Sequence, residues 1–185
     1  MKKLISVVIC LLMILSTVFC LAGCKSRTDE MVDLETYTTK QMNKTKKQVI
    51  TCINEQDKEG LKKLFSKDAQ KHIDDLDGKL DQLIGAFNGN KIESAKGSGT
   101  DFEGSADAQP LHIYGDYSLK FINGEKYVIM INICDIDDDN KEKEGLYQIT
   151  LMTFPKDAAP EEFYIETNDD DYGIFIYKKD GIQQQ

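Results

Sequence analysis

The stretch 116–136, "DYSLKFINGEKYVIMINICDI", decides the fold because it predicts two strands joined by a tight turn. Apolar and polar residues alternate in this stretch, which is typical of strands with one buried face. Asn123-Gly124 stands between the two runs, and this pair suits a two-residue type I′ turn. We therefore expect an antiparallel hairpin whose register is set by that turn.

A two-residue turn would divide the side chains of the hairpin between two faces. The first face should pack against helices, and it carries Tyr117, Leu119, Phe121, Val128 and Met130, followed by Asn132 and Cys134. The second face carries Ser118, Lys120 and Ile122 on the first strand, and Tyr127, Ile129, Ile131 and Ile133 on the second.

Both faces contain a candidate for binding. Because a buried amide needs a hydrogen-bond partner, we expect Asn132 either to line a pocket between helix and sheet or to bond a neighbouring backbone group. The second face would expose an apolar strip unless a C-terminal strand covers it. It is therefore a candidate surface for a homodimer or a protein partner, through Tyr127, Ile129, Ile131 and Ile133.

The segments before the hairpin have a helical period. Residues 40–56 place apolar side chains at near-helical spacing between lysines. Asp57 is suited to cap a second helix with Leu61, Leu64 and Phe65 in its core. The clearest stripe predicts a third helix that ends at the "NGN" of 88–90, and its members are Ile73, Leu76, Leu80, Leu83, Ile84 and Phe87.

Further strands are expected on both sides of the hairpin. The Gly- and Ser-rich stretch 91–110 predicts a loose edge strand followed by a mobile loop, and "GLYQITLMTF" predicts a strand at 145–154. A last pair of strands, 161–166 and 172–179, flanks "TNDDD". The order predicts an α+β fold, with N-terminal helices packed on one side of a curved antiparallel sheet of five to six strands.

The N-terminus has the layout of a secretory signal. Lys2 and Lys3 precede a run without charges at 4–23. Leu21-Ala22-Gly23-Cys24 resembles the lipobox of bacterial lipoproteins. That resemblance implies a diacylglyceryl group on the Cys24 thiol and cleavage just before it. The alternative is an uncleaved membrane anchor, since about 20 apolar residues can span a bilayer. Both alternatives leave the rest of the chain outside the cytoplasm, at the cell membrane.

These observations divide the chain into four parts. We expect a signal peptide at 1–23, a lipidated cysteine and polar tether at 24–39, one α+β domain at 40–180, and a tail at 181–185. The net charge of −9 and the lack of a basic stripe argue against a nucleic-acid partner. Cys52 and Cys134 either form a disulfide or lie separately in the core.

The order of the expected elements resembles that of the nuclear transport factor 2-like (cystatin-like) fold. The amino-acid sequence itself resembles a family of uncharacterised lipoproteins. The matching stretches are "LKKLFS" (61–66), "IDDLDGKLDQLIGAFNG" (73–89), "EKYVIMIN" (125–132) and "EGLYQI" (144–149). The resemblance implies a cone of sheet wrapped around a long N-terminal helix. It supplies a fold and implies no activity.

Metal sites and cofactors are not indicated by any spacing. The acidic loops 135–145 and 168–171 resemble a calcium loop, but the first lacks the glycine and the final glutamate of an EF-hand, so calcium binding there would be weak. His72 and His112 stand far apart, and no CxxC accompanies them, so a zinc site is not expected.

Catalysis is the alternative function. Catalytic members of the resembled fold set a Tyr beside an Asp or His within the cone, and the candidates here are Tyr117, Tyr127, Tyr147, Asp116 and His112. No spacing pairs a base with an acid among them. We therefore expect a membrane-anchored, non-enzymatic domain that binds a small ligand or a protein, with Asn132, Tyr117 and His112 as pocket residues. The alternative is a hydrolase or isomerase.

Overall fold

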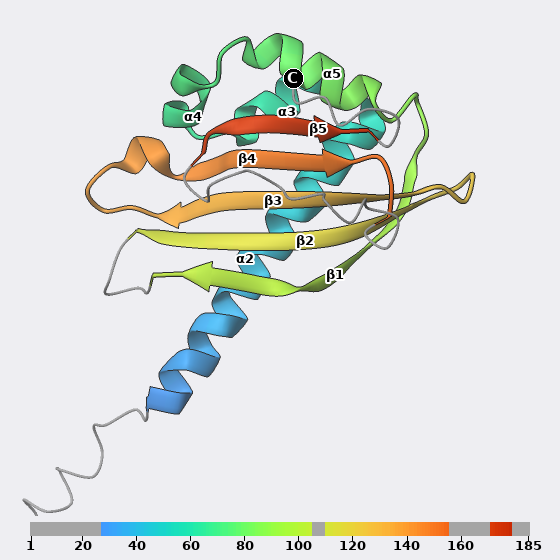
Figure 1. Cartoon of the computed structure of the whole chain (residues 1–185). Coiled ribbons are helices and arrows are strands. Elements are labelled where there is room, and N and C mark those ends of the chain that lie inside the picture. Colours follow the sequence, from blue (N-terminus) through green and yellow to red (C-terminus); the bar gives the residue numbers. More distant parts are fainter. Residues whose placement is uncertain (1–26, 105–109, 156–170, 179–185) are drawn as a thin grey trace, which may run out of the picture. The chain divides into compact units, whose positions relative to one another are not determined.

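The computed structural model describes residues 27–104, 110–155 and 171–178. The chain divides into two units after Glu35, and the unit from Thr36 onward contains the sheet. The described elements confirm the α+β class, since helices come first and strands follow (Figure 1). The signal segment 1–23, Cys24, the expected strand at 161–166 and the tail 181–185 lie outside the described residues.

Four helices precede the sheet: α2 (Arg27–Glu55), α3 (Lys58–Leu64), α4 (Lys67–His72) and α5 (Leu76–Gly85). The polar tether expected at 24–39 is helical from Arg27 onward, where α2 begins, so the first helix starts earlier than the predicted residue 40. Met31 and Val32 in its first turns are 60% and 54% exposed. A helix segment without a buried face shows no apolar period, and its sequence therefore gives no helical signal.

Side-chain caps define the short helices. Asp57 caps α3 as expected, since its Oδ1 accepts a hydrogen bond of 2.8 Å from the Gly60 amide. The expected helix at 73–87 begins later, because Ile73 is extended and Asp75 adopts a left-handed conformation (φ 50°). Asp75 then caps α5 by accepting from the Gly78 amide. The apolar stripe is thus shared between the end of α4 and α5.

Five strands form one sheet in the order of the chain: β1 (Ile92–Glu103), β2 (Leu111–Phe121), β3 (Lys126–Ile136), β4 (Gly145–Met152) and β5 (Gly173–Tyr177). The first four strands are antiparallel, but β5 runs parallel to β4, so the sheet is mixed. The expectation of a purely antiparallel sheet is wrong at this strand. Two parallel strands need a crossover connection, because a tight hairpin can join only antiparallel strands. The chain between β4 and β5 is long enough for such a crossover.

The turn between β2 and β3 differs from the predicted one. Lys120 pairs with Lys126, and the Gly124 amide donates to the Phe121 carbonyl at 3.0 Å, so Ile122, Asn123 and Gly124 form a three-residue loop. Gly124 has φ 89°, whereas Asn123 is not among the residues with positive φ. A type I′ turn needs positive φ at both central positions. The two-residue turn predicted from Asn123-Gly124 is therefore wrong, and the loop has three residues.

The extra loop residue shifts the register by one and moves the side chains of β3 to opposite faces. Tyr127, Ile129, Ile131 and Ile133 share the face of Tyr117, Leu119 and Phe121. Ile129 and Ile131 are fully buried, and Ile133 is 4% exposed. The expectation that this row forms an exposed interface is therefore wrong. These residues belong to the core, and Val128, Met130 and Asn132 occupy the other face.

Helices pack on the face of the sheet that carries this row. Behind the sheet, α2 from Thr36 onward crosses the strands, and its Met42 and Val49 are fully buried (Figure 1). The ring of Phe87, just after α5, packs at a tilt against those of Phe121 and Tyr127, and its centroid lies 5.8 and 6.1 Å from theirs. On the opposite face Val128 joins a smaller apolar cluster with Met152, Phe154 and Tyr177.

Alanine substitutions at adjacent β3 positions test this register. Ile131→Ala should lower the free energy of unfolding by about 2–5 kcal/mol, because it opens a cavity in the core between sheet and helices. Met130→Ala, at a half-buried position on the other face, should cost about 1 kcal/mol. Urea denaturation followed by circular dichroism measures both values. The reverse ranking would support the two-residue turn.

Candidate functional site

Asn132 lies on the face of the sheet away from the helices, which corrects the prediction that it lines a pocket between them. Its Nδ2 donates a hydrogen bond of 2.6 Å to Gln148 Oε1 on β4, and both residues are buried. Gln148 Nε2 in turn donates to the Asp171 carbonyl at 2.8 Å, next to β5. This amide pair ties three adjacent strands together and satisfies the buried polar atoms that it contains.

Tyr117 is a core residue of β2. It is 3% exposed, and its ring lies against Gly97 and Gly115, where an added Cβ would come within 3.0 Å of it. The Lys46 ammonium of α2 lies 4.7 Å from the ring centroid, as in a cation–π contact. Burial raises the pKa of the Tyr117 hydroxyl to about 12, which makes it a poor general acid at neutral pH.

The structure brings together one pair among the five catalytic candidates. His112 Nδ1 lies 3.3 Å from the Tyr147 hydroxyl oxygen, and the two rings meet edge to face. Tyr127 instead packs edge to face on Phe121 in the core. Asp116 alternates with Tyr117 along β2 and therefore lies on the other face. The candidates do not converge on one site.

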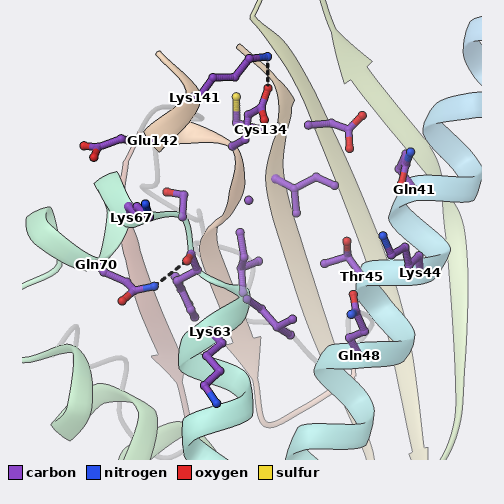
Figure 2. A pocket seen from close by; sticks show the side chains of 18 residues that line it. Gln41, Lys44, Thr45, Gln48, Lys63, Lys67, Gln70, Cys134, Lys141 and Glu142 are labelled. Carbon is purple, nitrogen blue, oxygen red and sulfur yellow. Dashed lines mark hydrogen bonds and ion pairs between the residues drawn. The ribbon is translucent and has the colours of Figure 1, made fainter. Parts of the chain in front are cut away.

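A groove of about 590 Å³ opens elsewhere, between α2, the turn from α3 to α4, and the ends of β3 and β4 (Figure 2). Asn132, Tyr117 and His112 do not line it. Its lining residues come from four parts of the domain: Gln41, Lys44, Thr45 and Gln48; Lys63, Leu64, Phe65, Ser66, Lys67 and Gln70; Ile133, Cys134 and Asp135; and Lys141, Glu142, Glu144, Gly145 and Leu146.

The α2 wall of the groove is polar. Gln41, Lys44, Thr45 and Gln48 recur at intervals of three, one and three residues, which places them on one face of a helix. Figure 2 shows these four side chains together along the same side of α2. The sequence reasoning followed apolar periodicity and therefore overlooked this polar stripe, although the same spacing rule would have found it.

The opposite wall depends on a close approach between backbones. The Ser66 amide donates a hydrogen bond of 2.8 Å to the Leu146 carbonyl, so the turn from α3 to α4 is held to the start of β4. Gly145 has φ 132°, and a Cβ there would lie 3.0 Å from the Ser66 nitrogen. Only glycine permits this approach. Gln70 Nε2 donates to the Phe65 carbonyl at 2.8 Å and stiffens the turn (Figure 2).

The lining is amphipathic. Phe65, Ile133 and Leu146 are at most 4% exposed and contribute apolar surface, while the surrounding residues are charged or carry amides and hydroxyls. Binding sites for small molecules commonly combine mostly apolar walls with a few placed polar groups, in cavities of about 300–1,000 Å³. The groove has the size of such a site, and its walls are more polar than those of most small-molecule sites.

The carboxylates of the groove are each engaged. Glu142 pairs with Lys71 at 2.5 Å, and this ion pair holds the pKa of Glu142 below its usual value. Glu144 pairs with Lys141 at 2.8 Å, which lowers the pKa of Glu144. Asp135 Oδ2 accepts a hydrogen bond of 2.7 Å from the Tyr37 hydroxyl. All three groups therefore have partners of their own.

The acidic loop 135–145 is organised by internal hydrogen bonds. Asp137 is 5% exposed, and its Oδ1 accepts from the amides of Asp139 and Asn140 at 3.1 and 2.8 Å. Glu144 Oε1 accepts from the Asp137 amide at 3.0 Å. Within the described residues, no group of three or more His, Cys, Asp or Glu side chains is placed to hold a metal ion.

The two cysteines of the domain are free thiols in the structure. Cys134 lines the groove, and burial raises the pKa of its thiol to about 11 from the ordinary 9.0. Burial also raises the pKa of Cys52 on α2. Because the thiolate is the nucleophile, both groups are held in their unreactive form at neutral pH.

Alkylation measures this protection directly. At pH 8 we expect iodoacetamide to modify Cys134 about 100-fold more slowly in the folded chain than in urea, because a thiolate is about 100-fold rarer when the pKa rises from 9 to 11. The rate in the folded chain should keep rising up to about pH 11. Mass spectrometry of the peptide that contains Cys134 follows the reaction. A plateau near pH 9 would contradict the burial of this thiol.

Comparison with known proteins identifies a family, and the description of that family names no activity. No curated protein matches the chain. The family model described as "Domain of unknown function (DUF5104)" matches residues 48–154. That range begins in α2, ends just after β4, and includes most of the residues that line the groove. Because the match spans more than half of the 185 residues, this chain belongs to the DUF5104 domain family.

Proposed function

We propose that this protein is a lipid-anchored binding protein on the outer side of the cell membrane, and that its groove binds a small molecule. The single observation that carries the binding role is the groove itself. It is a cavity of about 590 Å³ with an apolar floor and polar walls, and the hydrogen bond from Ser66 to Leu146 fixes one of these walls to β4.

The state of the polar groups favours binding over catalysis. A catalytic groove needs an acid or base that is available to the substrate. The carboxylates here are engaged by Lys71, Lys141 and Tyr37, and the Cys134 thiol stays protonated. The hydrolase or isomerase alternative would use His112 and Tyr147, but neither residue lines the groove.

The anchor is proposed from the lipobox alone. A thioether-linked lipid on Cys24 would carry two or three acyl chains, and each buried CH₂ contributes about 0.8 kcal/mol, so detachment would be negligible. No helix among the described residues is both long and apolar enough to cross a membrane.

We also propose that the domain has the nuclear transport factor 2-like architecture. The support is the arrangement of helices on one face of a sheet whose strands follow one another in chain order. In that architecture the long N-terminal helix lies along the inner face of the sheet. The course of α2 across one face of the sheet from Thr36 onward supports this proposal (Figure 1).

A bulky residue in the α2 wall tests the binding role. A panel of small organic compounds is screened by thermal unfolding of the full chain in nonionic detergent. A compound at ten times its Kd adds about 1.4 kcal/mol of stability, which raises Tm by roughly 3–6 °C. Thr45→Trp fills the groove and should abolish these shifts. Lys47→Trp, at an exposed position of the same helix outside the groove, should retain them.

The outcome that contradicts the binding role is equally specific. If the stabilising compounds act equally on the Thr45→Trp variant, they bind outside the groove. If no compound stabilises the wild-type chain, the groove is not a small-molecule site. Far-UV circular dichroism of both tryptophan variants ensures that lost shifts do not reflect lost structure.

Substitution of Cys24 tests the anchor. In cells fed an alkyne fatty acid, Cys24→Ser should remove the label and leave the chain as an uncleaved precursor or release it from the membrane fraction. Cys52→Ser is the matched control, since it removes a cysteine on α2 and should keep the label. Unchanged labelling of Cys24→Ser would refute lipidation at this residue.

A further inference from the structure

We propose that the groove selects a small organic anion, a carboxylate or a phosphate ester with a short apolar body. This inference rests on the proposed binding role of the groove and specifies its ligand. It follows from the charges around the cavity rather than from its size.

Three lysines around the groove form no ion pair among the described residues. Lys44, Lys63 and Lys67 line the cavity from three separate elements, α2, α3 and α4 (Figure 2). Other lysines of the domain do form ion pairs at 2.7–2.9 Å, and these are Lys58, Lys62, Lys120 and Lys141. The whole chain is acidic, with 32 acidic and 23 basic residues, whereas the lysines around this cavity form a local positive region.

The negative charges of the lining are largely compensated. Glu142 forms an ion pair with Lys71, and Glu144 shares Lys141 with Asp138, so both carboxylates of the lining face an ammonium group. Lys67 also lowers the pKa of Glu142, although less than Lys71 does. The remaining acidic residue is Asp135, which accepts the Tyr37 hydroxyl. The lining contains four lysines, Lys44, Lys63, Lys67 and Lys141, and three carboxylates, Asp135, Glu142 and Glu144. The charge of the lining residues is therefore positive by one unit.

The uncharged residues specify the rest of the ligand. Thr45 and Gln48 on α2 offer a hydroxyl and an amide beside Lys44, and both groups can donate hydrogen bonds to an oxyanion. Phe65 and Leu146 supply the apolar surface for the body of the molecule. A carboxylate and a phosphate both satisfy this chemistry, because ammonium groups bind either one as a point charge.

Three probes with the same apolar body isolate the charge. The full chain in nonionic detergent is titrated at low salt with 3-phenylpropionate, 3-phenylpropionamide and 3-phenylpropylamine by calorimetry, with empty micelles as the blank. We expect the carboxylate to bind at least tenfold more tightly than the amide, and the amine more weakly than the amide. Phenyl phosphate provides the phosphate arm, and its affinity relative to the carboxylate decides between the two head groups.

Single Lys→Gln variants locate the interaction. Lys44→Gln, Lys63→Gln and Lys67→Gln should each weaken binding of the tighter anion about three- to fivefold, which is the range of exposed ion pairs. The triple variant should weaken it about 30-fold or more. Lys47→Gln is the matched control, because it removes the same charge from α2 outside the groove and should change affinity less than twofold.

The anion inference and the binding role of the groove are contradicted by different outcomes. If the amide and the carboxylate bind equally and Thr45→Trp abolishes both, the anion inference is overturned while the groove remains a binding site. If Lys47→Gln weakens binding as much as Lys44→Gln, net charge and not the groove attracts the anion, and the inference is also overturned. If no probe binds at millimolar concentration, the anion inference fails for both head groups.

Discussion

The pairing of β2 with β3 is the constraint on which the rest of the domain depends. Leu119 faces Tyr127 because the loop at 122–124 has three residues, and Gly124 supplies the positive φ that closes it. A strand alternates its side chains with a period of two, so one residue more in the loop exchanges the faces of β3. The isoleucines of β3 thereby join the apolar face of β2, and that combined face is what the helices cover.

The same register places the polar residues of the sheet. Asn132 moves away from the helices and pairs with Gln148, which reaches the Asp171 carbonyl beside β5. These hydrogen bonds run from β3 through β4 to the residue two positions before β5, so a side chain expected to bind a ligand instead stabilises the sheet. The helix side of β3 is left to Ile131 and Ile133, and Ile133 forms part of the apolar floor of the groove.

The groove lies where α2 and the turn from α3 to α4 are separated above the ends of β3 and β4. The turn from α3 to α4 is fixed to β4 through Ser66 and the close approach at Gly145. α2 is held by other contacts: its Tyr37 hydroxyl donates to Asp135 on β3, and its Asn54 side chain exchanges two hydrogen bonds with the backbone of Ile92 at the start of β1. The two walls are therefore positioned by independent contacts, and the space between them is lined by polar and cationic side chains.

The amino-acid sequence by itself determined the elements whose signals are local. Asp57 caps α3, and the apolar stripe from Ile73 to Phe87 is largely buried. The α+β order follows from the change near residue 90 from a helical period of about 3.6 residues to a strand period of two. The start of α2 escaped prediction because an exposed helix has no apolar period. Only the tertiary structure decided the register of β3, the direction of β5 and the meeting of Lys44, Lys63 and Lys67 around one groove. Each of these depends on contacts between residues distant in the chain, and a local pattern cannot specify which partner a strand or a helix face will meet.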